Sequence, residues 1–207
     1  MVQCIDYFEG ELQSVILTEY LEGGELFQRI SSEDYLLTEA KCRDFVRQIL
    51  LGVEFIHNKR IIHLDLKPQN IVLCQKLKEG PTNGNSDGYL ISPDELKIID
   101  FGLARALGPT GDRVPINMCG TLEFMSPEVM RCHHASPASD MWSLGIIMYM
   151  MVSGGLSPFW GGNEYRTQRN VLRYVFIEEG GEEMPNVEVP GRFFWFFAFF
   201  FSINFSF

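Results

Sequence analysis

The chain has 207 residues, of which 46% are apolar and 21% charged, as in a packed soluble protein. Its formal net charge of −10 argues against a nucleic-acid surface as the main partner and is compatible with basic peptides. The five cysteines form no CxxC pair and are not dense enough for a disulfide framework, so a reduced, cytoplasmic environment is expected.

The first predicted elements are two strands, at residues 2–8 and 14–20. Both segments are rich in β-branched and aromatic residues, and a Glu-Gly-Glu turn at residues 9–11 lies between them, which together indicate a hairpin. The Gly pair at 23–24 ends the second strand. A short helix is expected over about residues 25–30.

A long amphipathic helix is expected after Thr38, a residue type that suits an N-cap. Apolar residues at three- and four-residue spacing mark its core-facing side: Cys42, Phe45, Ile49, Val53 and Ile56. A later helix, at about residues 140–152, is apolar nearly all round, which is typical of a helix buried in the centre of a domain. Ser139 is its expected N-cap.

Two short apolar runs, at residues 71–73 and 96–99, predict strands. Between them, residues 75–93 are rich in Gly, Asn, Ser and Asp, have no apolar period, and are expected to form a flexible loop. The Glu-Glu-Gly-Gly-Glu-Glu run at 178–183 predicts a solvated linker.

The last segment, residues 193–207, holds nine of the 17 Phe residues of the chain. Its continuous apolar run of nine residues is about half of what a membrane-spanning helix needs. We interpret it as a non-homologous tail that comes from a truncated or misread gene. A membrane-surface anchor is the alternative, but the segment lacks the basic flank that helps such anchors bind, so membrane binding is not expected.

Four motifs follow one another in the middle of the chain. Residues 63–70 read HLDLKPQN, residues 100–102 read DFG, residues 120–128 read GTLEFMSPE, and residues 139–145 read SDMWSLG. An aspartate, a lysine, an asparagine and a second aspartate in this order are the groups that a phosphoryl-transfer site needs.

These motifs resemble those of eukaryotic Ser/Thr protein kinases. HLDLKPQN, the DFGLAR run and the SGGLSPF run at 153–159 are similar to the myosin light chain kinase and death-associated protein kinase group. The resemblance covers about residues 2–176 and implies an α+β, kinase-like fold that is present in part. A remnant of the small lobe and the hinge would lie at residues 1–21 and a mainly helical large lobe at 22–177, followed by the linker and tail at 178–207.

The resemblance implies transfer of the ATP γ-phosphoryl group to Ser or Thr, with Mg²⁺. Asp65 would accept or orient the proton of the substrate hydroxyl, and Lys67 would balance charge near the transferred phosphate. Asn70 and Asp100 would bind Mg²⁺ through oxygen atoms. Leu64 replaces the Arg that reads an activation-segment phosphate in many kinases, so no such phosphate is expected to be required.

The resemblance also implies a nucleotide site formed by hinge and pocket-floor residues: Thr18, Glu19, Leu21, Glu25, Leu26 and Val72. Thr18 would be the gatekeeper, and Glu19 and Leu21 would offer backbone groups to adenine. Leu26 and Val72 would form the floor of the adenine pocket. Glu25 would meet the ribose or a basic substrate residue, and an ordinary first-turn helix acid is an equal alternative for it.

The resemblance also implies that the side chains of His63, Phe101 and Asp140 form an internal stack and anchor.

A further expectation concerns activity. The 207 residues contain no Gly-rich phosphate loop and no phosphate-binding strand lysine before the HLDLKPQN motif, so the polypeptide alone is expected to be inactive.

Three hypotheses stay open for the function. The chain is part of a Ser/Thr kinase, a non-catalytic module that binds substrates or partners, or a peripheral membrane protein that uses its tail. The expected partners are proteins with basic residues near Ser or Thr, and nucleic acid is not among them. Calmodulin-type regulation belongs, if anywhere, to a full-length parent protein.

Overall fold

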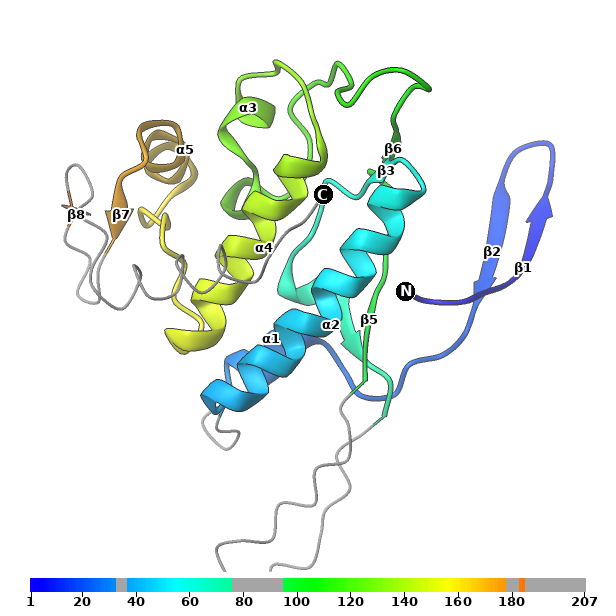
Figure 1. Cartoon of the computed structure of the whole chain (residues 1–207), viewed down its shortest axis with the longest axis horizontal. Helices are drawn as coiled ribbons and strands as arrows, with labels where there is room; N and C mark the ends of the chain where they lie inside the picture. The colour runs from blue at the N-terminus through cyan, green and yellow to red at the C-terminus, as the bar shows by residue number, and fades with distance from the viewer. Residues whose placement is uncertain (33–36, 76–94, 178–182, 185–207) are drawn as a thin grey trace, which may run out of the picture. The chain divides into compact units, whose positions relative to one another are not determined.

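A computed structural model describes most of the chain (Figure 1), namely residues 1–32, 37–75, 95–177 and 183–184. The chain divides into two compact units, residues 1–157 and 158–207. Within the described residues, no helix is both long enough and apolar enough to cross a bilayer. Apart from residue 75, the predicted loop lies outside the described residues, as do the Phe-rich tail and most of the acidic linker.

The first unit begins with the predicted hairpin. Strands β1 (Cys4–Glu9) and β2 (Ser14–Thr18) pair antiparallel, and the side chains of both strands are exposed. Just after β2, the Glu19 carboxylate forms an ion pair with Lys97 Nζ at 2.7 Å. This ion pair ties the base of the hairpin to a strand that comes much later in the chain.

Two helices follow the hairpin, and both were predicted. Helix α1 (Leu26–Ile30) is short, and helix α2 (Glu39–Asn58) is long. The Thr38 hydroxyl accepts the backbone N–H of Lys41 at 3.3 Å, which confirms Thr38 as the N-cap. All five predicted core-facing residues of α2 are buried, because their spacing places them on one side of the helix.

Two small antiparallel sheets position the motif segments. Strand β3 (Ile61–Ile62) pairs with β6 (Arg105–Ala106), and β4 (Ile71–Leu73) pairs with β5 (Leu96–Ile98). The 3₁₀ helix η1 (Pro68–Asn70) leads directly into β4. The two ladders therefore place the loop between β3 and β4 beside the loop between β5 and β6. The strands predicted at 71–73 and 96–99 are confirmed, the second to within one residue.

The GTLEFMSPE run forms the 3₁₀ helix η2 (Leu122–Phe124) and helix α3 (Pro127–Met130). Helix α4 (Pro137–Val152) starts earlier than predicted: its N-cap is Ser136, and Ser139 lies three residues inside the helix. The hydroxyl of Ser139 accepts the backbone N–H of Ser136 at 3.2 Å. The prediction of Ser139 as the cap was wrong because a proline suits the first helical position and lets the helix begin there.

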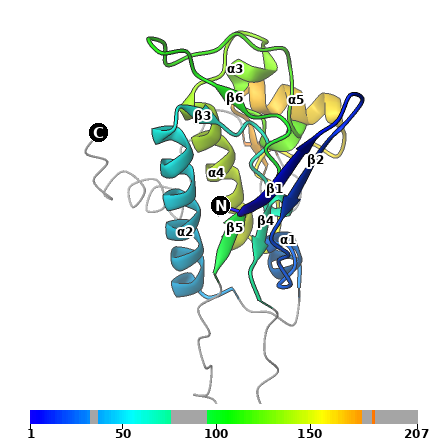
Figure 2. The same cartoon turned by 90° about the vertical axis from the view of Figure 1, so that its right-hand side faces the viewer.

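Helices α2 and α4 lie side by side in the core of the first unit (Figure 2). Most of the apolar side chains of α4 are buried: Leu144, Ile146, Ile147, Met148, Met150 and Met151. The predicted burial of this helix is confirmed. The removal of these side chains from water contributes to the hydrophobic stabilisation of this unit.

The second unit contains helix α5 (Glu164–Arg173) and two short strands. Asn163 caps α5, since its side chain accepts the backbone N–H of Arg166 at 3.0 Å. Strand β7 (Phe176–Ile177) pairs antiparallel with β8 (Glu183–Met184). Glu183, predicted to be the end of the linker, is instead the first residue of β8, because backbone pairing with β7 places it in a strand.

The packing of α4 leads to a stability prediction. We expect Ile147→Ala, at a fully buried position, to lower the free energy of unfolding by about 2–5 kcal/mol, because it removes apolar contacts and leaves a cavity. The matched control Val152→Ala, at an exposed position on the same helix, should change it by no more than about 0.5 kcal/mol. Urea unfolding followed by circular dichroism would measure both values, and equal losses would contradict the burial of α4.

Candidate active site

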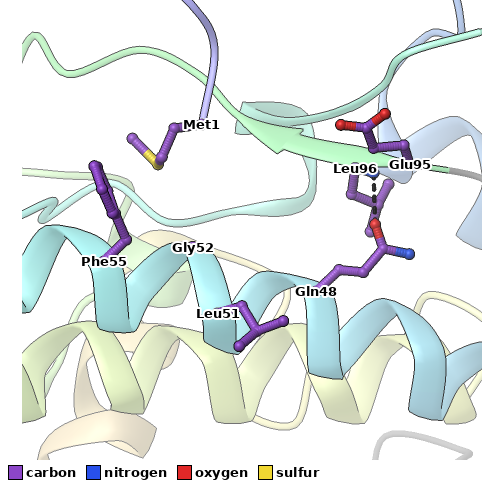
Figure 3. Close-up of a pocket in the computed structure, with 7 residues that line it drawn as sticks. All are labelled: Met1, Gln48, Leu51, Gly52, Phe55, Glu95 and Leu96. Atoms are coloured by element: carbon purple, nitrogen blue, oxygen red, sulfur yellow. Dashed lines mark hydrogen bonds between the residues drawn. The ribbon is translucent and has the colours of Figure 1, made fainter.

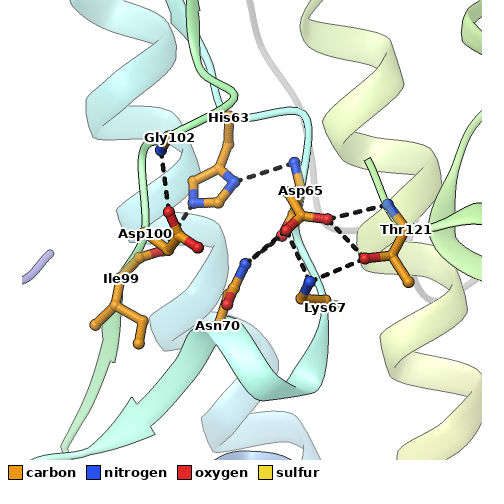
Figure 4. A network of polar contacts seen from close by, with 8 residues as sticks. All are labelled: His63, Asp65, Lys67, Asn70, Ile99, Asp100, Gly102 and Thr121. Carbon is orange, nitrogen blue, oxygen red and sulfur yellow. Dashed lines mark hydrogen bonds and ion pairs between the residues drawn. The ribbon is translucent and has the colours of Figure 1, made fainter. Parts of the chain in front are cut away.

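Asp65 lies in the loop between β3 and η1, and three side chains hold its carboxylate (Figure 4). Lys67 Nζ is 2.8 Å from Oδ2, and Asn70 Nδ2 donates to the same oxygen at 3.0 Å. Thr121 donates to Oδ1 from its hydroxyl at 2.8 Å and from its backbone N–H at 3.1 Å. With both oxygens bound and the residue only 9% exposed, the carboxylate is held in one orientation.

The same contacts decide the charge of Asp65. Burial by itself would raise the pKa of this carboxyl, but the hydrogen bonds from Lys67 and Thr121 outweigh that effect, and the net pKa lies below the ordinary aspartate value. The carboxylate is therefore ionised at neutral pH. An ionised carboxylate can accept or orient the proton of a hydroxyl group that comes within hydrogen-bond distance.

Of the predicted metal ligands, Asn70 lies opposite Ile99, the residue before Asp100, since the backbone N–H of Ile99 donates to the Asn70 carbonyl at 2.9 Å. Asn70 uses its Nδ2 to bind Asp65, so its Oδ1 is the atom that could bind a cation. The Asp100 carboxylate accepts the backbone N–H of Gly102 through Oδ1 at 3.0 Å. An amide oxygen and a carboxylate oxygen are the hard ligands that Mg²⁺ prefers.

A buried carboxylate fixes the backbone on which Asp65 lies. Asp140 accepts the backbone N–H groups of His63 and Leu64, each at 2.9 Å, and His57 Nε2 lies 2.8 Å from the same side chain. The rings of His63 and Phe101 meet edge to face with centroids 4.8 Å apart. The predicted stack and anchor are therefore present in the structure.

The six predicted nucleotide-site residues fall into two groups. The first group comes from the end of β2 and the residues after it, where Thr18 is exposed and the ammonium of Lys97 lowers the pKa of Glu19; Leu21 lies further along this segment. In the second group, the backbone of Glu25 forms an isolated β-bridge with that of Val72. Leu26, beside them, is fully buried.

A surface pocket lies elsewhere in the first unit, between α2 and β5 (Figure 3). Its lining residues are Met1, Gln48, Leu51, Gly52, Phe55, Glu95 and Leu96. Gln48 accepts the backbone N–H of Leu96 at 2.8 Å and closes one end of it. No predicted catalytic, metal or nucleotide residue lines this pocket, so the candidate site is defined by the polar cluster around Asp65.

Thr121 is the site residue that was not singled out from the sequence. Besides its two bonds to Asp65, its hydroxyl accepts from Lys67 Nζ at 2.9 Å. Its position in the GTLEFMSPE run was the available signal, but nothing in that run indicates a contact with a residue 56 positions earlier. Near the end of the run, Glu128 accepts the hydroxyl of Ser139 at 2.6 Å.

Comparison with known proteins agrees with this geometry. Residues 1–189 match the family model described as protein kinase domain, and the chain therefore belongs to the protein kinase family. The predicted kinase resemblance and the kinase-like α+β fold are confirmed, with the described elements forming part of that fold.

Curated proteins that are similar to this chain include several myosin light chain kinases. Myosin light chain kinase 2 of skeletal/cardiac muscle from Rattus norvegicus and from Homo sapiens are each 46% identical over 188 residues, 90% of this chain. The smooth-muscle myosin light chain kinase of Gallus gallus is 45% identical over 188 residues. The chain spans 28% of the two skeletal/cardiac relatives and 9% of the smooth-muscle one.

The carboxylate cluster leads to a pH prediction. We expect Thr121→Val to raise the pKa of Asp65, because the hydroxyl hydrogen bond that favours the ionised form is lost while the backbone N–H bond and the burial remain. The matched control Thr110→Val, at an exposed position, should leave this pKa unchanged. Carboxyl ¹³C NMR titration would measure both.

The sign of the linked stability effect follows from the lowered pKa. The stabilisation from these hydrogen bonds is present above the ordinary aspartate pKa of about 3.9 and is lost as the pH falls through the lower folded-state value. A Thr121→Val variant whose Asp65 titrates as in the unmodified chain would contradict the assignment of these contacts.

Proposed function

We propose that the chain supplies the catalytic loop of a Ser/Thr protein kinase, with Asp65 accepting or orienting the proton of the substrate hydroxyl. The observation that carries this proposal is the ionised Asp65 carboxylate, bound by Lys67, Asn70 and Thr121. Membership of the protein kinase family supports it. Phosphoryl transfer depends mainly on positioning and charge neutralisation, and a fixed carboxylate with an ammonium 2.8 Å away meets part of that need.

Three residues around Asp65 are proposed to neutralise the phosphates of ATP, either directly or by binding Mg²⁺. Lys67 would balance negative charge on the transferred group. Asn70 Oδ1 and the Asp100 carboxylate would hold Mg²⁺, which would neutralise charge on the phosphates of ATP, the donor of the phosphoryl group. Family membership supports the use of ATP and Mg²⁺.

The nucleotide base is proposed to bind beside the segment after β2. Thr18 would be the gatekeeper, and the backbones of Glu19 and Leu21 would meet adenine. Val72, paired with Glu25, and the fully buried Leu26 would form the floor of the adenine pocket. Glu25 would then lie near the ribose or a basic side chain of the substrate.

The proposed substrates are cytoplasmic proteins with basic residues near Ser or Thr. The net charge of −10 and the acidic Glu25 favour such partners. Leu64 is buried and apolar, so it cannot bind a phosphate on the activation segment, and activity of a longer parent is proposed not to require one. Calmodulin-type regulation is likewise a property that only such a parent could have.

The assigned base can be tested in a chimera that carries residues 22–177 in place of the matching part of an intact homologous kinase. We expect Asp65→Asn to lower kcat on a basic peptide by roughly 10²-fold or more, because the amide cannot accept the hydroxyl proton. Radiolabelled phosphate transfer would measure the rate. Asp112→Asn, at a side chain that is 88% exposed, is the matched control and should keep full activity.

Full turnover in Asp65→Asn would show that the base is another residue. Loss of activity in both variants would instead indicate damage to the fold. Circular dichroism of the two chimeras separates these outcomes, since Asp65→Asn keeps the volume of the side chain and most of its hydrogen-bond partners.

The polypeptide of residues 1–207 is itself proposed to be inactive and to bind ATP poorly. Ligand sites derive their affinity from enclosure together with a few placed polar groups. The sequence offers no Gly-rich loop and no strand lysine to cover the phosphates. We expect calorimetric titration with Mg²⁺·ATP to detect no micromolar binding and the transfer assay to detect no turnover, whereas either signal would contradict this proposal. An inactive polypeptide is also what the hypothesis of a non-catalytic binding module requires.

A further inference from the structure

The activation segment, residues 103–119, joins the DFG run to the GTLEFMSPE run. Near its start, β6 pairs with β3. Just after its end, the backbone N–H of Thr121 donates to the Asp65 carboxylate at 3.1 Å. Between these two points the segment is a loop, so the contacts that this loop makes determine how firmly Thr121 is held on Asp65.

Arg60, in the turn between α2 and β3, binds the loop that follows β6. Its Nη2 donates to the backbone carbonyls of Gly108 and Gly111. Its own backbone carbonyl accepts the N–H of Leu107 at 2.8 Å. Residues 107–111 are therefore held by both the backbone and the side chain of a single residue.

The backbone of Arg60 indicates that its side chain has a role. Arg60 follows Lys59, the C-cap of α2, and has a φ of 60°. Glycine is the usual residue at this position of a helix end, because it adopts the left-handed conformation without strain. A larger residue that accepts such strain points to a function, and the two bonds from the guanidinium supply one.

A second contact holds the segment between Arg60 and Thr121. Val114 and Ala135 form an isolated β-bridge in which each N–H donates to the other carbonyl at 2.9 Å. If the bonds from Arg60 were lost, the residues between β6 and this bridge would gain conformational freedom. Ordering them again would then cost free energy whenever Thr121 binds Asp65.

We propose that Arg60 is a positioning residue, which clamps the activation segment through the Gly108 and Gly111 carbonyls and so keeps Thr121 on Asp65 without any phosphate. In many kinases a phosphate bound by arginine orders this segment. Backbone carbonyls are present in the unmodified chain, so this clamp needs no phosphorylation. The role in catalysis rests on the proposed kinase function, whereas the clamp itself does not.

Hydrogen exchange of the 207-residue chain, followed by NMR, tests the clamp. Arg60→Gly removes the guanidinium and suits the left-handed backbone, so the turn itself is not strained. We expect the amides of Val114 and Thr121 to exchange roughly tenfold faster or more, because charge-assisted hydrogen bonds that oppose local opening are lost. Amides in the middle of α4 should keep their rates.

Two controls belong to the same experiment. Lys59→Ala removes a neighbouring exposed cation and leaves the clamp in place, so it should not change these rates. The amide of Leu107 is an internal control, since its acceptor is the backbone carbonyl of residue 60, which Arg60→Gly retains. Continued protection of Leu107 shows that the turn is intact.

Unchanged exchange at Val114 and Thr121 in Arg60→Gly would overturn the proposal. If Leu107 also exchanges faster, the turn has opened, and Arg60→Asn decides instead. Asparagine tolerates the left-handed conformation, but its side chain is too short to replace the guanidinium. Faster exchange at Val114 and Thr121 in that variant supports the clamp, and unchanged exchange refutes it.

The role in catalysis is tested in the chimera that carries residues 22–177. We expect Arg60→Gly to lower kcat by about threefold or more, because kcat scales with the fraction of molecules whose segment is ordered. The KM for ATP should not change, since the described bonds of Arg60 are with its own turn and the activation segment. Lys59→Ala should keep both values.

The outcomes in the chimera separate the two proposals. An unmodified chimera without turnover would contradict the proposed kinase function, and the exchange rates would still decide whether Arg60 clamps the segment. An active chimera whose kcat is the same in Arg60→Gly would overturn the positioning role of Arg60 and leave the proposed function standing.

Discussion

The buried carboxylate of Asp140 is the interaction on which the candidate active site depends. It lies in the first turn of α4, most of whose apolar side chains are buried, and it is fully inaccessible to solvent. It accepts the backbone N–H groups of His63 and Leu64, and His57 of α2 contacts the same side chain. A buried charge is tolerated only when such partners satisfy it, so α2, α4 and the loop after β3 are bound to one another at this point.

The loop that Asp140 holds is not a relaxed backbone. Leu64 has a φ of 68°, and Asp100 on the facing loop has a φ of 59°, a region that non-glycine residues rarely occupy. Such conformations persist only where the surroundings determine them, and they occur often at functional sites. At Leu64 the determining contact is its N–H bond to Asp140. The next residue is Asp65, so the strained backbone sets the direction of the candidate base.

The hairpin contrasts with this site in how it is held. The Asp65 cluster is buried and made of charge-assisted bonds, which are short and strong. The hairpin is exposed along its whole length and is tied to β5 by the Lys97–Glu19 ion pair and by the N–H of Val2, which donates to the Ile98 carbonyl at 3.0 Å. The Lys97–Glu19 pair is partly buried, with side chains 20% and 24% exposed, so solvent screens it more than the enclosed bonds to Asp65.

Much of the architecture could be predicted because it is encoded locally. The three- and four-residue spacing and the Thr38 cap determined α2, since both act within one or two turns of helix. The four ordered motifs determined the family. The start of α4 at Pro137 rather than after Ser139 was misjudged, although its signal is also local, because a proline suits the first helical position and Ser136 precedes it.

What the sequence by itself determined was therefore the hairpin, helices α1, α2 and α4, strands β4 and β5, and most of the chemical groups at the site. Only the tertiary structure decided how those groups are paired. Thr121 binds Asp65 from 56 residues away, and Lys97 binds Glu19 from 78 residues away. Contacts of this kind have no period and no local spacing, because they form only when separate elements pack together. For the same reason, the lowered pKa of Asp65 is a property of the fold and not of the motif that contains it.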